Sequence, residues 1–502
     1  MTERAQPTPR SPARFVACAP AVLLCSLFAL GSLASERQPL RIDDIIDRAV
    51  ESSPKVRVAK EEAAKAAARH SEEVGRAFPR VTLTSLFSVA PGHTGDPLEP
   101  RGSLFDHWGF VFRLEVQGQV PLYTFGALSA HRHATRMRAE AARVRMADVI
   151  REVRLDVRRA WNERRRAAEV AAVIEDGLKH IDEIDEVLEW MDFEDHEDYD
   201  QIEALMLRVR RSDLQIRLET ARREETIARK RLALHLEIAD PSTLIFAEED
   251  LAPPLEALPS LDALDSLAPL LNPRLRAGRR EIDAARDEHR AARRSLLPEL
   301  FIAGRVQLGL STSSDRQESP FARDIANRRS AAIMIGMQVP LDIPQRITRR
   351  DTAEARASHI ARTQKSTETE VRRRVARAHG RLADDLELLP TLSEAAAAAE
   401  EWFKERREAF HERPGRLRGV LRSAEQAIDR RVAVIETLTR LNTGLALLSR
   451  EVGVDESTVL SLAPRAIPER RTTPPRKLEI PEGLSPELRE RLKKRLEAME
   501  TF

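Results

Sequence analysis

The chain carries the same plan twice, and this duplication constrains its fold more than any other feature. Three prolines of the first half recur in the second half at one constant distance along the chain: Pro54 and Pro273, Pro79 and Pro298, Pro121 and Pro340. Matching neighbours accompany them, since Gln119-Val120-Pro121-Leu122 recurs as Gln338-Val339-Pro340-Leu341. A fixed offset over this length indicates two copies of one structural unit. We place the units at residues 41–240 and 263–462, joined by a linker at 241–262.

Each unit contains two segments of strict apolar and polar alternation. We expect strands at about 80–90 and 108–121 in the first unit, and at about 299–310 and 330–340 in the second. A period of two gives a strand one apolar and one polar face. The residues that we assign to the apolar faces, and expect to contact lipid, are Val81, Leu83, Phe87, Phe110, Phe112, Leu114, Val116, Leu300, Ile302, Val306, Ile333 and Ile335.

The strands suit a membrane better than a soluble core. Their length is close to that of a tilted strand which crosses a bilayer, roughly ten residues. Trp108, Tyr123 and Phe125 lie near strand ends, where interfacial aromatic residues belong. The alternative is a soluble sheet with one buried face. It is disfavoured because nothing else in the chain is apolar enough to cover two hairpins.

Very long helices follow each pair of strands. Residues 127–191 contain no proline and one glycine, Gly177. Apolar residues recur there at spacings of three and four, as in Ile150, Val153 and Val157, which predicts a narrow coiled-coil seam. The segment Ile202–Ile238 returns, and the second unit repeats the pattern. The fold class is therefore mainly α with a small β part, built from duplicated α-helical hairpins and four amphipathic strands.

Four strands in one chain cannot close a membrane barrel. Small barrels need about eight strands, and an open edge cannot face lipid because its backbone groups would lack hydrogen-bond partners. Several copies must therefore pool their strands. Closure of the sheet is required by this physics, whereas the number of copies is not fixed by it.

Composition excludes other classes of function. The 502 residues contain 82 Lys+Arg and 81 Asp+Glu, and this balance argues against a nucleic-acid binder. No Gly-x-Ser-x-Gly motif, Walker loop or His-Glu-x-x-His pair occurs, so we expect no enzyme, no catalytic residues, no cofactor and no metal.

Residues 1–34 at the N-terminus are typical of an export signal. Arg10 and Arg14 precede an apolar run, and Ser32-Leu33-Ala34 supplies small residues for cleavage. The alternative is a membrane anchor that stays. Both cysteines lie in this run, so the mature chain has no disulfide. Lipid attachment at Cys25 is disfavoured because Leu24 occupies a position that needs a small residue.

The duplicated plan resembles the TolC-type outer-membrane efflux family over about residues 41–460. The resemblance rests on Asn272-Pro273-Arg274-Leu275, its variant Ser53-Pro54, and the strand-ending Val120-Pro121-Leu122-Tyr123-Thr124-Phe125-Gly126. Pro121, Gly126 and Pro340 mark the strand-to-helix turns, although the second copy lacks the glycine.

This resemblance implies a homotrimer in the cell outer membrane of a Gram-negative-type envelope, with a shared 12-stranded transmembrane β-barrel and a coiled-coil tunnel in the periplasm. It also implies an exit duct of a tripartite efflux pump or type I secretion system, which conducts substrates passively. The implied partners are a periplasmic adaptor, an inner-membrane pump and outer-membrane lipid. A soluble periplasmic coiled-coil scaffold or adaptor is the alternative.

The two hairpin tips differ in charge. By the resemblance they meet the adaptor, and the candidate docking residues are Asp195, His196, Glu197, Asp198, Tyr199, Arg413, Pro414, Gly415, Arg416 and Leu417. The first tip is acidic and the second basic, so neighbouring tips either pair or present charge to the adaptor. Two solvated turns without a partner are the alternative. The acidic tip lacks the Gly-centred loop of an EF-hand, which disfavours metal binding.

The last segment, residues 463–502, is rich in proline and arginine. Thr472-Thr473-Pro474-Pro475-Arg476 predicts an extended linker, and Ser485-Pro486 a short helix.

Overall fold

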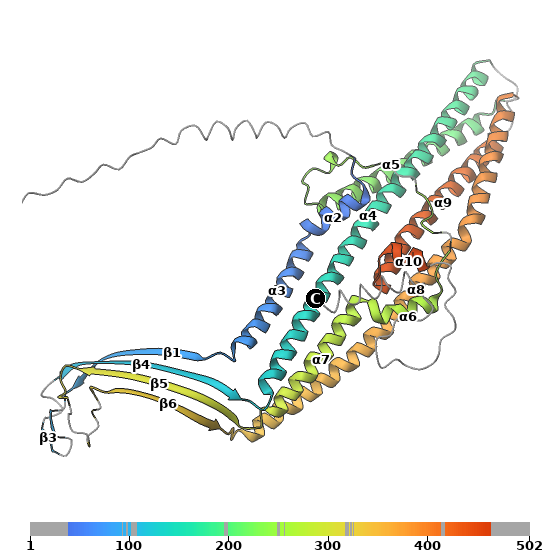
Figure 1. Cartoon of the computed structure of the whole chain (residues 1–502). Coiled ribbons are helices and arrows are strands. Elements are labelled where there is room, and N and C mark those ends of the chain that lie inside the picture. Colours follow the sequence, from blue (N-terminus) through green and yellow to red (C-terminus); the bar gives the residue numbers. More distant parts are fainter. Residues whose placement is uncertain are drawn as a thin grey trace, which may run out of the picture.

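A four-stranded sheet lies at one end of an elongated molecule, and long helical hairpins extend from it to the other end (Figure 1). The computed structural model describes residues 39–92, 94–96, 99–101, 108–194, 199–247, 251–255, 257–316, 321, 324, 326–412 and 417–462. The predicted signal at 1–34 and the tail at 463–502 lie outside the described residues.

Each half opens with two short helices. In the first half these are α2 (Ile42–Ser52) and α3 (Pro54–Gly75), and in the second they are α6 (Leu261–Leu271) and α7 (Pro273–Arg294). The two pairs start and end at the same offset along the chain that the prolines show. Because α6 belongs to the second half, that half begins within our predicted linker.

Residues 41–77 do not form one continuous helix. The helix breaks at Ser53, whose backbone is extended at φ −59° and ψ 122°, because a residue before proline avoids the helical conformation. Asn272 adopts nearly the same conformation, with φ −62° and ψ 122°. Its Oδ1 accepts a hydrogen bond from the N–H of Arg274 at 2.9 Å and so caps α7.

Two helical hairpins form the length of the molecule. They are α4 (Ala127–Phe193) with α5 (Gln201–His235), and α8 (Ile343–Glu412) with α9 (Leu417–Val452). The 67 residues of α4 span about 100 Å. Val153 and Val157 of the predicted seam are buried, and Ala160, Ala167 and Ala171 continue the buried stripe.

Within the described residues, the helices bury three apolar clusters rather than one central core. One joins α6, α8, α9 and α10 (Glu456–Leu462), and a second lies between the hairpins toward their ends. The third packs α2 against α4 and α5 around Trp161, whose ring lies 5.5 Å from that of Phe246. Phe246 follows the short η1 (Pro241–Thr243) and pairs with Leu40 as a parallel bridge. The chain before α2 is thus tied to the linker.

The sheet is antiparallel, in the order β1 (Arg80–Pro91), β4 (Trp108–Tyr123), β5 (Glu299–Ser311) and β6 (Arg329–Gln338). The four predicted strands are present, and their observed bounds differ from the predicted ones by at most two residues. A small hairpin of β2 (Thr94–Asp96) and β3 (Glu99–Arg101) lies in the first loop and was not predicted. Within the described residues, the outer edges of β1 and β6 pair with no strand.

None of the described helices is both long enough and apolar enough to cross a membrane.

Candidate functional site

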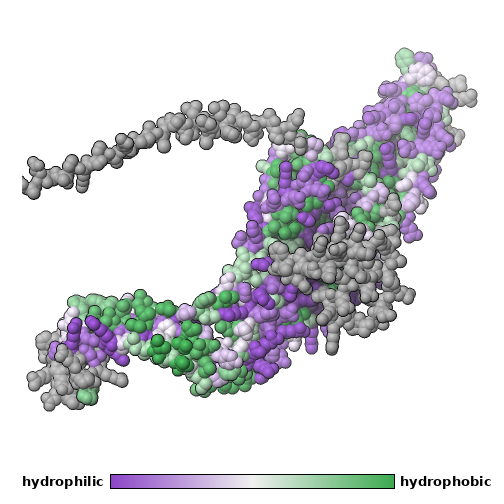
Figure 2. Space-filling view, viewed as in Figure 1, coloured by the Kyte–Doolittle hydropathy of each residue, from purple (hydrophilic) through white to green (hydrophobic). Residues whose placement is uncertain are grey.

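The apolar face of the sheet is continuous across both halves. Strand register places Val116 opposite Leu83 on one side and Val306 on the other. Ile302 in turn lies opposite Ile335. All twelve residues that we assigned to the apolar strand faces share this face, and none of them is buried. Figure 2 shows hydrophobic side chains gathered over the sheet, whereas hydrophilic ones cover most of the helical part.

The opposite face of the sheet is polar. Thr82, Gln117 and Arg305 face one another across β1, β4 and β5, and Glu115 and Gln307 form the next row. The Nε of Arg305 lies 3.0 Å from Oε1 of Glu115. Each strand therefore separates an apolar surface from a hydrogen-bonding one.

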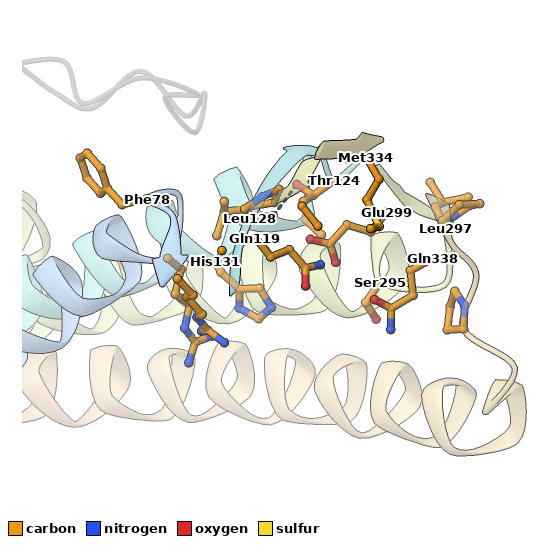
Figure 3. A pocket seen from close by; sticks show the side chains of 18 of the residues that line it. Phe78, Gln119, Thr124, Leu128, His131, Ser295, Leu297, Glu299, Met334 and Gln338 are labelled. Atoms are coloured by element: carbon orange, nitrogen blue, oxygen red, sulfur yellow. Dashed lines mark hydrogen bonds between the residues drawn. The ribbon is translucent and has the colours of Figure 1, made fainter. Parts of the chain in front are cut away.

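A hollow of about 620 Å³ lies where this polar face meets the helices. Its lining comes from β1, β4, β5 and β6 and from the ends of α4, α7 and α8. Figure 3 shows Gln119, Glu299 and Gln338 among the strand residues, with His131 from α4. Five arginines belong to the lining: Arg76, Arg80, Arg294, Arg305 and Arg346.

The predicted strand-to-helix turns border this hollow. In the first turn Phe125 and Gly126 have positive φ of 50° and 79°, a conformation that favours glycine. The Nη1 of Arg294 donates to the carbonyl of Gly126 at 3.1 Å, so α7 fixes the turn. Pro121 lies at an irregularity in the pairing of β4 with β5.

The second turn reaches the same place without a glycine. Pro340 lies just beyond β6 and lines the hollow. Asp342 accepts a hydrogen bond from Nε of Arg346 at 2.6 Å, and Nη1 of Arg346 donates to the carbonyl of Ser295 at 2.7 Å. An ion pair at the start of α8 thus takes the position that Gly126 holds at the start of α4.

The opposite ends of the hairpins are tied to each other. The backbone N–H of Leu417 donates to Oε2 of Glu203 at 2.7 Å, which joins α9 to α5. Leu417 is fully buried, and Tyr199 packs against the same apolar cluster. Both support the tips from inside. The other candidate tip residues lie outside the described residues: Asp195, His196, Glu197, Asp198, Arg413, Pro414, Gly415 and Arg416.

Ion pairs cross between the hairpins near these ends. Arg217 of α5 lies 2.9 Å from Asp429 of α9, and Arg210 lies 3.2 Å from Glu425. These side chains are about half exposed, so each pair contributes at most about 1 kcal/mol. These ion pairs favour the pairing of α5 with α9, but they contribute little to the free energy of folding.

His235 and Glu456 are partly buried titratable groups of the helical part. Burial lowers the pKa of His235 below its usual value, at the end of α5. Burial raises the pKa of Glu456, although Arg158 lies 2.9 Å away and opposes this shift. Neither residue lines the hollow. Across the described ranges, no three His, Cys, Asp or Glu residues come close enough to hold a metal ion.

A family model called outer membrane efflux protein matches the chain twice, at residues 45–186 and 265–411. Together the two matches cover more than half of the chain. The chain belongs to this family. Its members are efflux channels of the outer membrane rather than enzymes, and the chain is an outer-membrane protein with its helical part in the periplasm.

Solved channels of low sequence identity share the fold. The chain superposes on CusC with a TM-score of 0.69 at 14% identity, covering 83% of this chain and 93% of CusC. For VceC of Vibrio cholerae the TM-score is 0.67 at 14% identity, with 82% and 96% covered. For MtrE of Neisseria gonorrhoeae, solved in its open state, it is 0.65 at 17% identity, with 82% and 89% covered. No curated protein matches the sequence significantly.

Sequence reasoning missed the basic hollow. Its arginines come from separate segments spread from Arg76 to Arg346, and no local spacing links them. The signal available in the sequence is the polar face of the predicted strands, which carries Arg80, Arg113, Glu115 and Arg305.

Proposed function

We propose that the chain forms a passive exit duct by assembling as a homotrimer, which closes a twelve-stranded barrel in the outer membrane. The duct receives cargo in the periplasm from an inner-membrane pump through an adaptor protein. The proposal covers a tripartite efflux pump or a type I secretion system. No residue performs chemistry in it, and the pump supplies the energy.

One observation carries the assembly: apolar residues of the two returning helices, α5 and α9, differ sharply in exposure. On α5, Ile202, Val209 and Ile216 are 61%, 60% and 66% exposed. On α9, Leu421, Ile428 and Ile435 are 6%, 7% and 7% exposed. The residues of α9 are buried because this helix packs on α4 of the other half. The equivalent cover for α5 is α8 of a neighbouring copy.

The other contacts fit the same rule. α4 packs against α3 and α5 of its own half and against α7 and α9 of the other half. α8, the counterpart of α4, packs extensively against α7 and α9 of its own half. Among the described helices it has no contact of comparable extent with α3 or α5 of the other half. Likewise β4 pairs on both edges, whereas its counterpart β6 pairs on one. If the contact between the two halves is repeated between copies, α3 and α5 of the next copy pack on α8, and its β1 pairs with β6.

Such a head-to-tail contact produces a closed ring or an open filament. A ring leaves no strand edge facing lipid, which is the requirement for a membrane sheet. Two copies supply eight strands and three supply twelve, and both numbers occur among membrane barrels. Three copies follow from the likeness to the efflux family, with the apolar strand faces toward lipid and the polar faces toward the lumen.

The hairpin ends farthest from the sheet are the proposed docking site for the adaptor. Their sequences carry opposite charge, as in Glu197-Asp198 and Arg416. Reversing the first pair with Glu197→Lys and Asp198→Lys is expected to abolish export while the trimer persists. The matched control is Asp47→Lys with Glu51→Lys, at exposed positions of α2, whose main contacts lie within its own half. Intact export in the tip variant would remove the docking role.

The alternative, a soluble periplasmic scaffold or adaptor, is separated by one experiment. The full chain is expressed in a Gram-negative host, the membranes are fractionated, and the mass is measured in mild detergent. We expect recovery from the outer membrane at three times the chain mass, with conductance in planar bilayers. A soluble monomer in the periplasm would contradict the duct and the barrel together.

A further inference from the structure

The hollow at the sheet–helix junction has an excess of positive charge. Its lining holds five arginines but one carboxylate, that of Glu299. Three of the arginines have acidic partners: Arg76 lies 3.1 Å from Glu73, Arg305 lies 3.0 Å from Glu115, and Arg346 lies 2.6 Å from Asp342. Arg294 is engaged by the carbonyl of Gly126.

A carbonyl does not neutralise a guanidinium, so Arg294 and Arg80 both keep their charge, and Arg80 is the one of the two that lies on the sheet. Its side chain is exposed at the start of β1 and forms no ion pair with any described residue. Register places it opposite Gln119, in the row next to Gln117 and Arg305. A free guanidinium thus stands beside two amide side chains and a second guanidinium. Guanidinium groups bind carboxylates and phosphates through two parallel hydrogen bonds.

The same face carries a second exposed arginine farther along the strands. Arg113 lies opposite Leu86 and Gly309, and the part of the chain that the structure describes gives it no acidic partner. On this face the described strand residues comprise Arg80, Arg113 and Arg305 against Glu115 and Glu299. The polar face therefore has a net positive charge in every copy.

We infer that the junction hollow is an anion subsite on the conduction path, centred on Arg80, and that the duct prefers anionic cargo. Carboxylate- or phosphate-bearing solutes are the class that this lining binds. The inference rests on the proposed function, because the polar face lines the path only when copies close a barrel. A concave surface of one charge raises the local concentration of ions of opposite charge, and low-dielectric walls strengthen the effect.

The test measures the reversal potential of the reconstituted full-length protein in a planar bilayer under a potassium chloride gradient. We expect the wild type to favour chloride over potassium. Arg80→Gln lowers the chloride-to-potassium permeability ratio by about twofold, and Glu299→Gln raises it. The control is Arg329→Gln, since Arg329 lies opposite Leu308 on the other face of the same sheet.

Each outcome decides a separate point. Channels that favour potassium, or whose selectivity is unchanged in both Arg80→Gln and Glu299→Gln, overturn the anion subsite and leave the duct intact. An equal shift in Arg329→Gln also overturns it, because the effect then comes from overall charge. A trimer that forms no conducting channel contradicts the proposed function itself. Retained anion preference in Arg80→Lys identifies charge as the cause, whereas loss in that variant points to guanidinium geometry.

Discussion

The sheet and the returning helices α5 and α9 differ in which half of the chain exposes apolar side chains. In the sheet the exposure occurs in both halves: Val116 is partly exposed, and its counterpart Ile335 is 75% exposed. On the returning helices it occurs in the first half, since Ile216 of α5 is 66% exposed whereas Ile435 of α9 is 7% exposed. Exposure shared by both halves calls for a surrounding medium, such as lipid. Exposure confined to one half calls for another copy of the chain.

The strongest test of this difference is to introduce a charged residue on the exposed apolar surface of α5. Ile216→Asp is expected to leave the monomer folded, since the side chain is exposed there, but to dissociate the proposed trimer. The reason is that burying an unpaired carboxylate in an interface costs several kcal/mol. Mass in mild detergent measures the outcome, with Ile216→Leu as the control that keeps the trimer. A stable trimer of the aspartate variant would remove α5 from the interface.

A charge on the apolar strand face tests the other half of the comparison. Ile335→Arg is expected to cost about 2–4 kcal/mol per copy in the membrane and to reduce recovery from the outer membrane. The matched control is Ser330→Arg on the same strand, because Ser330 lies opposite Gln307 on the polar face. Equal recovery of the two variants would show that the apolar face does not contact lipid.

The ion pairs between the hairpins are expected to matter less. Asp429→Asn removes the partner of Arg217 and lowers the free energy of unfolding by about 0.2–1 kcal/mol, because both groups are half exposed. Thermal unfolding of the trimer measures this loss. High salt should reduce the difference between wild type and variant, and a difference that grows with salt would exclude an electrostatic origin.

The smallest expected effect is a pH dependence from His235. Burial lowers its pKa, with Asp156 opposing and Lys55 supporting the shift. The native state therefore binds fewer protons than the unfolded state just below the ordinary pKa of 6.5, and stability falls as the pH drops through that range. His235→Gln should flatten the change in melting temperature between about pH 7.5 and about pH 5.5. An unchanged slope would assign the effect to other groups.

The elements that sequence predicted well are those with a local period. The four strands and the long helices follow from alternation and from seam spacing within single segments, and the structure contains them close to the expected positions. The break at Ser53 is also readable from Pro54, because the residue before a proline avoids the helical conformation. The helix α6 begins at Leu261, at the end of the predicted linker, and Pro269 inside it is unusual for a helix.

Features that depend on distant segments were not predictable. The contacts of Arg305 with Glu115 and of Arg217 with Asp429 each join the first half of the chain to the second. The asymmetry of exposure between α5 and α9 was equally hidden, because both helices carry apolar residues and the sequence does not show which neighbour covers them. Only packing reveals which of the two helices is covered.

The two hairpins turn over different lengths of chain. Residues 194–200 separate α4 from α5, whereas the shorter segment 413–416 separates α8 from α9. In a ring of three copies the turns therefore alternate between long and short, so the periplasmic mouth has threefold rather than sixfold symmetry. An adaptor present in six copies has to bind at two different kinds of site, whereas an adaptor present in three copies can bind at one kind alone. The unequal turns thus bear directly on the stoichiometry of the assembled pump.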